Sequence, residues 1–241
     1  LLIKRFWHST FGKYLKHFKC LYAYRTLHLC EGPGAFISAL NVYILLNKDI
    51  QFKNKWMWYA NSLNPHFECN EPSSLFLDDE LITATQDHWI FGPDNSGNIL
   101  HWDAEYLLKL QSELGSFHLV TADGSLYCQD DPKEQEALTF PLIKQEIEIA
   151  KLLLTEGGSL VVKIYTFTSE YTVKFLKEIT ELFQSIHLLK PSCSKPGNSE
   201  VCSLNFNILR CAQFFAEHQK DMLQFNLVTF PITKEILFSV N

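Results

Sequence analysis

Short apolar runs alternate with longer helix-like segments through most of the chain. Buried parallel strands are nearly continuous in apolar residues, whereas helices repeat them every three or four positions. The expected strands cover 24–30, 56–63, 117–123, 159–167, 185–191 and 200–209, and the expected helices cover 35–47, 104–114, 133–158 and 168–183. This alternation predicts an α/β domain with a mostly parallel sheet and helices on both faces.

The length and composition are those of one large domain over residues 1–241. With 46% hydrophobic and 20% charged residues the chain resembles an ordinary globular protein, and no repeat or low-complexity linker divides it. No apolar run reaches the length that crosses a membrane, and no signal peptide is recognisable. Because the first residue is Leu1 rather than Met, we expect the sequence to be a piece of a longer chain.

Positive charge is concentrated at the start of the chain. The formal net charge of −6 argues against non-specific coating of nucleic acid. The first thirty residues nevertheless contain no acid and these basic residues: Lys4, Arg5, Lys13, Lys16, Lys19 and Arg25. Residues 1–20 are expected to form a basic helix with an apolar stripe at Phe11, Leu15 and Phe18. Its charged face could bind phosphates or could simply be solvated.

The cysteine pattern indicates a reducing compartment. The seven cysteines are scattered, and none forms a C-x-x-C pair. This pattern argues against a disulfide framework and a zinc site, and it fits the nucleus or the cytoplasm. The nine histidines form no recognisable set of metal ligands, so no metal is expected.

The segment HLCEGPGAF at 28–36 lies between an expected strand and an expected helix. Gly32 and Gly34 let the backbone turn sharply and approach a ligand closely. The helix that follows offers backbone N–H groups to that ligand. The spacing departs from the G-x-G-x-x-G pattern of nicotinamide-binding proteins. The turn therefore indicates a nucleoside-like cofactor, with a purely structural turn as the alternative.

Charged residues are expected at neighbouring strand ends. Asp123 closes the strand at 117–123, and Lys163 lies inside an apolar strand, where a lysine is rarely buried without a partner. An acid at the tip of a neighbouring strand could supply that partner, although a snorkelling lysine remains an alternative. Glu200 begins another strand. A cluster of lysines and carboxylates at one sheet edge would suit proton removal from a weak acid.

Four motifs, in this order, carry a family resemblance: LCEGPGAF, LVTADGS, EGGSLVVKIYTF and KPSCSKPGNSEVC. They resemble the FtsJ-like ribose 2′-O-methyltransferases, which have a Rossmann-like α/β fold and use S-adenosyl-L-methionine without a metal. WMWYANSLNP and WIFGPDNSGNI narrow the resemblance to the branch that methylates the second transcribed nucleotide of capped mRNA. The resemblance covers residues 10–209.

The resemblance implies a Lys-Asp-Lys-Glu tetrad of Lys13, Asp123, Lys163 and Glu200. The first lysine is selected by TFGKYLKHF, where Phe11 replaces the family's tryptophan, and Lys16 is the alternative. The implied cofactor contacts are Gly32, Pro33, Gly34, Ala35, Phe36, Asn61, Ser62, Asn98, Ile99 and Asp123. Many relatives carry an acid where this chain has Asn98, and an amide can still read an adenine edge.

The family's reaction is in-line methyl transfer to a ribose 2′-hydroxyl, which requires RNA rather than DNA. By resemblance, Lys163 would be the general base, Lys13 would orient the hydroxyl, and Asp123 would hold Lys163. Glu200 would hold Lys13 or complete the network. The expected partner is the 5′ end of capped mRNA, with no membrane. The alternatives are methylation of the first cap nucleotide or another RNA, an inactive RNA-binding module, and a nicotinamide-dependent oxidoreductase.

Overall fold

The computed structural model describes residues 23–46, 55–75, 78–126, 128, 134–165, 169–189 and 201–208. For 185, 187–189 and 201–208 it describes the backbone alone. The expected basic helix at 1–20, with both candidate lysines Lys13 and Lys16, lies outside the described residues. So does Glu200.

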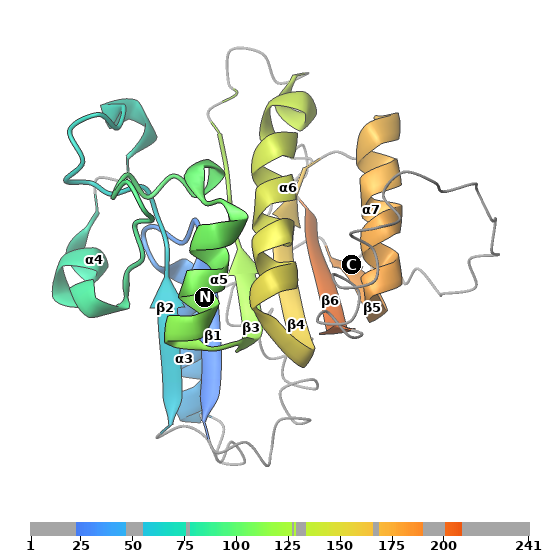
Figure 1. Cartoon of the computed structure of the whole chain (residues 1–241), viewed down its shortest axis with the longest axis horizontal. Coiled ribbons are helices and arrows are strands. Elements are labelled where there is room, and N and C mark those ends of the chain that lie inside the picture. Colours follow the sequence, from blue (N-terminus) through green and yellow to red (C-terminus); the bar gives the residue numbers. More distant parts are fainter. Residues whose placement is uncertain are drawn as a thin grey trace.

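Six strands form one sheet in the order β2-β1-β3-β4-β6-β5 (Figure 1). They are β1 (Tyr24–Leu29), β2 (Trp56–Ala60), β3 (Phe117–Ala122), β4 (Leu154–Ile164), β5 (Phe183–Leu189) and β6 (Val201–Ile208). β1 pairs in parallel with β2 and β3, and β3 pairs in parallel with β4. β6 runs antiparallel to both of its neighbours, β4 and β5. The expected mostly parallel sheet is confirmed, and the reversal of β6 is an addition that the apolar pattern did not predict.

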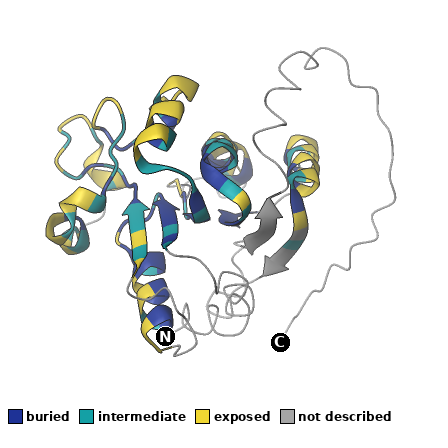
Figure 2. Ribbon diagram, turned by 60° about the horizontal axis from the view of Figure 1, so that its bottom comes forward, coloured by how far each residue is buried: buried dark blue, intermediate teal, exposed yellow. Residues whose placement is uncertain are grey.

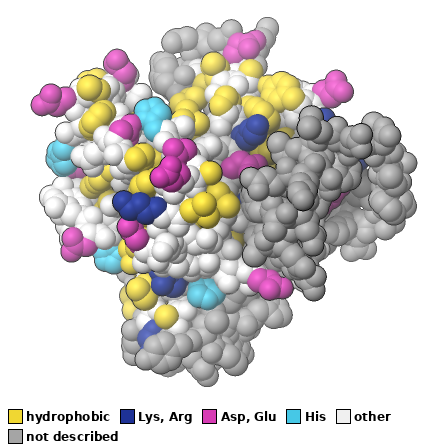
Figure 3. Space-filling view, viewed as in Figure 1, with side chains coloured by type: hydrophobic (Ala, Val, Ile, Leu, Met, Phe, Trp, Pro, Cys, Tyr) yellow, Lys and Arg dark blue, Asp and Glu magenta, His cyan; other side chains and the backbone are white. Residues whose placement is uncertain are grey.

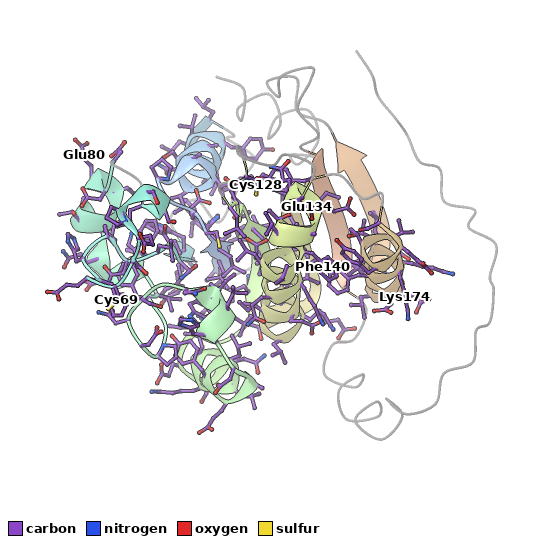
Figure 4. The ribbon with its side chains drawn as sticks, turned by 90° about the horizontal axis from the view of Figure 1, so that it is seen from above. Cys69, Glu80, Cys128, Glu134, Phe140 and Lys174 are labelled. Carbon is purple, nitrogen blue, oxygen red and sulfur yellow. The ribbon has the colours of Figure 1, made fainter. Side chains whose placement is uncertain are left out.

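Helices cover both faces of the sheet, as expected. The helices are α3 (Ala35–Leu46), α4 (Glu80–Ala84), α5 (Ala104–Leu114), α6 (Gln135–Leu153) and α7 (Glu170–Leu182). Seen from above, α3 lies on one side of the sheet, and α5, α6 and α7 lie on the other (Figure 4). The segment between β2 and α5, which contains α4, lies beside the β2 edge at the left of Figure 1. The carboxyl ends of the parallel strands therefore share one edge with the loops that follow them.

The long helix α6 ends earlier than the sequence pattern predicts. We expected a helix over 133–158 that stops at the glycine pair, but α6 ends at Leu153 and Gly157 and Gly158 lie within β4. The reason is tertiary pairing: the backbone of Leu154 turns extended and pairs with Phe117 of β3. Pro141 lies within the single helix α6 and does not divide it.

The main core fills the space between the sheet and the α5–α6 layer. Its largest fully buried side chains include Phe117 and Phe183 from the sheet. Figure 2 shows that the sheet-facing side of α6 is buried while its outer side is exposed. Each fully buried apolar side chain of this size contributes about 1.5–3 kcal/mol of transfer free energy. This packing makes the central strands a rigid support for the groups at their carboxyl ends.

Candidate active site

A cavity of about 670 Å³ opens at the carboxyl ends of β1, β2 and β3. Its wall contains Cys30 after β1, residues 62–63 and 73–75 after β2, residues 97–100 before α5, and Asp123 after β3. Side chains from α6 close the remaining side. Ligands bind at this position in open α/β sheets, because loops diverge there and leave a crevice.

The EGPG turn is held by its own acid. Glu31 is buried, and its Oε1 accepts hydrogen bonds from the N–H groups of Phe36 at 2.6 Å and Ile37 at 3.2 Å. Burial raises the pKa of this carboxyl well above its usual range. Gly34 has φ +109°, and a Cβ there would lie 2.2 Å from Leu81 Cδ2, so the turn requires glycine at this position.

This arrangement corrects the expectation that α3 offers unpaired N–H groups to a ligand. The carboxyl group of Glu31 already occupies the first turn of α3, where a nicotinamide dinucleotide would place its pyrophosphate. The geometry therefore argues against the oxidoreductase alternative. Gly32 is buried and Pro33 is exposed at the tip of the turn, with Ala35 opening the helix. Among the described residues of this turn, it is Cys30 that lines the cavity.

The residues expected after β2 have different roles in the structure. Asn61 is fully buried, and its amide donates to the carbonyls of Ile90 at 2.9 Å and Gly97 at 3.0 Å. It therefore ties the end of β2 to the loop before α5. Ser62 lines the cavity. Gly97 has φ +78°, and a Cβ there would lie 2.0 Å from the backbone oxygen of Ser62, so this close approach requires glycine.

Asn98 and Ile99 line the cavity together. The Asn98 side chain accepts a hydrogen bond from the N–H of Leu100 at 3.1 Å and so caps the short helix at Ile99–His101. Ile99 is almost fully buried. The turn therefore places a polar backbone segment next to an apolar side chain, which suits the edge and face of a purine.

Asp123 and Lys163 form an ion pair across adjacent strands. Lys163 Nζ lies 2.8 Å from Asp123 Oδ1 and donates a second hydrogen bond, at 3.0 Å, to the backbone oxygen of Asp123. The Lys163 side chain is 11% exposed and that of Asp123 is 30% exposed. Asp123 is thus the partner that the sequence predicted for a lysine in an apolar strand. Their catalytic roles stay predictions.

One buried group beside this pair was missed by the sequence analysis. Glu146 of α6 is fully buried, and its Oε1 accepts a hydrogen bond from the N–H of Gly124 at 2.8 Å. Burial raises the pKa of Glu146 to about 8. Burial and the neighbouring Glu146 carboxyl raise the pKa of the Cys30 thiol. The available signal was an acid on the apolar stripe of a helix, four residues after Leu142 and three before Ile149.

His28 is another buried polar residue and lies in the interior of the sheet. It hydrogen-bonds to Thr26 Oγ1 at 2.9 Å and Thr121 Oγ1 at 2.8 Å. Burial lowers its pKa to about 3, so the ring is neutral. In the part of the chain that the structure describes, no group of three His, Cys, Asp or Glu residues is placed to hold a metal ion. None of the described helices is long and apolar enough to cross a bilayer.

The sheet order, the reversed β6 and the cavity at the strand ends define a Rossmann-like methyltransferase fold. A crystal structure described as a ribosomal RNA methyltransferase from Plasmodium falciparum shares this fold, with a TM-score of 0.53 and 17% identity. That match covers 87% of this chain and 98% of the other. The chain belongs to the FtsJ-like methyltransferase family, whose model matches residues 12–207.

The chain is also similar to longer proteins. It is 45% identical over 179 residues to the mouse cap-specific mRNA (nucleoside-2′-O-)-methyltransferase 2. That match covers 73% of this chain and 23% of the mouse protein. It is 38% identical over 205 residues to the Drosophila melanogaster protein of the same name. This second match covers 80% of this chain and 29% of the fly protein. The chain thus spans less than a third of the length of these two relatives.

Proposed function

We propose that this domain transfers a methyl group from S-adenosyl-L-methionine to the ribose 2′-hydroxyl of the second transcribed nucleotide of capped mRNA. The observation that carries the proposal is the ion pair between Lys163 and Asp123, a residue that lines the strand-end cavity of an FtsJ-like fold. The names of the mouse and fly relatives support the choice of capped mRNA and of the 2′-oxygen.

The cavity fits S-adenosyl-L-methionine by the chemistry of its wall. Ser62, Asn98 and Ile99 offer polar and apolar contacts for an adenosine. The carboxylate of Asp123 offers a negative charge for the cationic methionine end. When bound, this cofactor supplies an electrophilic methyl group on its sulfonium. The turn at 32–36 would support the adjoining backbone rather than cradle a pyrophosphate.

The catalytic residues act through position and proton transfer. Two oxygens of Asp123 hold Lys163 Nζ, and these contacts would position it for a substrate hydroxyl. Lys163 would take the 2′-hydroxyl proton, in its neutral form, as the oxygen attacks the methyl group. Lys13 would orient the hydroxyl, and Glu200 would hold Lys13 or complete the network. Much of the rate enhancement should come from alignment of two bound substrates.

The RNA would reach this edge with help from the basic start of the chain. On the face that Figure 3 presents, Asp and Glu side chains are scattered with few Lys or Arg among them. Lys13, Lys16 and Lys19 would add positive charge for the RNA phosphates. Phosphate contacts by such a segment would position the RNA without reading its sequence. A nuclear or cytoplasmic location fits the scattered cysteines, and it is part of this proposal.

The test is methyl transfer to short capped RNAs, with and without a methyl group already on the first nucleotide, followed by mapping of the product. We expect label on the second nucleotide. Label on the first nucleotide, or on uncapped RNA, would assign one of the alternative substrates. No transfer to any RNA by a folded protein that binds the cofactor would favour the inactive RNA-binding alternative.

The matched variants are Lys163→Ala and Lys174→Ala. Lys174 is an exposed lysine on α7, and Figure 4 shows it pointing away from the sheet. Lys163→Ala should abolish transfer while cofactor binding persists, and Lys174→Ala should behave like the unaltered protein. Normal turnover by Lys163→Ala would show that the base is assigned to the wrong residue.

A further inference from the structure

The peptide group that joins Asp123 and Gly124 is hydrogen-bonded on both sides. Its carbonyl oxygen accepts from Lys163 Nζ at 3.0 Å. Its N–H donates to Glu146 Oε1 at 2.8 Å. The same peptide plane thus links a carboxyl group on α6 to the ammonium group of Lys163. Rotation of that plane would turn the carbonyl away from Lys163 and break both contacts.

The packing around Glu146 constrains the position of its side chain. The side chain is fully buried, on the face of α6 that packs against β3 and β4. A Cβ on Gly124 would lie 2.5 Å from Glu146 Oε1, so the carboxyl group fills the space that a side chain at 124 would need. The backbone after β3 and the helix above it are therefore matched to each other at this point.

The charge state of Glu146 suits this contact. The titratable groups that face it are Cys30 from the end of β1, Asp123 from the end of β3 and Lys163 from β4. Burial raises the pKa of Glu146 to about 8, and the negative charge of Asp123 acts in the same direction. Near neutral pH the carboxyl group is mostly protonated. It can accept from Gly124 without adding a second negative charge beside Lys163.

We propose that Glu146 is a positioning residue for methyl transfer: it fixes the Asp123–Gly124 peptide so that the Asp123 carbonyl and carboxylate both face Lys163. This inference rests on the proposed function, in which Lys163 acts on the 2′-hydroxyl. Loss of the acceptor should leave Lys163 mobile and its Nζ misdirected. The methyl-transfer step should then slow while the cofactor still binds.

The experiment compares Glu146→Gln with Glu146→Leu. Glutamine keeps a carbonyl oxygen for the Gly124 N–H, whereas leucine keeps a similar volume and removes the acceptor. Glu148→Leu is the matched control, because Glu148 lies on the same helix, is partly exposed and pairs with Lys151. For each folded variant we would measure kcat and KM with capped RNA, cofactor affinity by calorimetry, and amide hydrogen exchange of Gly124 by NMR.

We expect Glu146→Leu to lower kcat by about 10-fold or more, the scale set by leaving a buried N–H unpaired. KM and cofactor affinity should change by less than about threefold. A threefold change corresponds to less free energy than the smallest cost of leaving a buried N–H unpaired. Glu146→Gln and Glu148→Leu should stay within about threefold of the unaltered protein in every quantity. An undiminished kcat in Glu146→Leu would overturn the inference. So would an equal loss in Glu146→Gln, because the acceptor would then not be what matters.

The exchange measurement separates this inference from the proposed function. If the unaltered domain methylated no RNA, the proposed function would fail, and the Gly124 amide would still report on Glu146. Faster exchange of that amide in Glu146→Leu, with protection kept in Glu146→Gln, supports the link between the two residues. Unchanged protection in Glu146→Leu would refute the link whatever the activity.

Discussion

Glu146→Gln should change how the stability of this domain depends on pH. Glutamine occupies nearly the same volume and is neutral at every pH. In the unfolded chain Glu146 has its ordinary pKa of 4.5, and in the folded protein burial raises the pKa to about 8. Between these values the unfolded chain loses the proton while the folded protein keeps it. The contribution of Glu146 to stability is therefore full below pH 4.5 and falls as the pH rises to about 8.

The size of the effect follows from the interval between the two pKa values. Each pH unit within it is worth about 1.4 kcal/mol, so the interval from 4.5 to about 8 corresponds to roughly 5 kcal/mol. Glu146→Gln removes this dependence. The free energy of unfolding of the variant, relative to the unaltered protein, should rise across the window by several kcal/mol. Glu31 and His28 also titrate with shifted pKa values, but they are present in both proteins and cancel in the difference.

The assay is urea unfolding followed by tryptophan fluorescence at several pH values between 5 and 8, at constant ionic strength. Glu148→Gln serves as the control, because Glu148 lies on the same helix, is partly exposed and pairs with Lys151. A stability difference between Glu146→Gln and the unaltered protein that stays constant over this range would refute the reasoning. It would mean that Glu146 ionises normally in the folded state, and that a charged carboxylate faces Gly124.

Three further outcomes are expected. Gly97→Ala should destabilise the domain by about 2 kcal/mol or more, measured by thermal unfolding, because its Cβ would collide with the backbone oxygen of Ser62 and φ is positive; an unchanged melting temperature would contradict the close approach. Asp123→Asn should lower kcat at least about 10-fold, since it removes the charge but not the carbonyl that faces its lysine partner; equal kcat values would show that the carbonyl alone suffices. Charge reversal of Lys16 and Lys19 to Glu should weaken RNA binding and reduce its dependence on salt concentration; an unchanged salt titration would leave these lysines as solvated surface.

The sheet followed from local patterns to a large extent. Apolar runs marked β1 and β3 almost to their ends, because burial on both faces leaves little choice of residue. The pattern failed at two points where pairing decided the backbone. The contact of Leu154 with Phe117 ended α6 before Gly157, and the reversal of β6 depended on its position between β4 and β5.

The candidate site was predictable where a residue type was out of place in its own strand. Lys163 in an apolar run implied a partner, and Asp123 at the end of the neighbouring strand is that partner. Contacts that depend on packing were not predictable in this way. Two such contacts are the hydrogen bond from the first turn of α3 to the Glu31 carboxyl group and the hydrogen bond from Asn61 to the loop at Gly97, and both depend on the path of the backbone.

The sequence by itself determined the α/β class, the family and the two charged residues at the strand ends, because these depend on residue types in local order. Only the tertiary structure decided which groups hold Lys163 in place. Glu146 lies 22 residues from Gly124, and Lys163 lies 40 residues from Asp123. Contacts at such separations form only when α6 packs on the sheet and excludes water from the peptide that joins them, which makes each hydrogen bond there stronger than it would be in solvent.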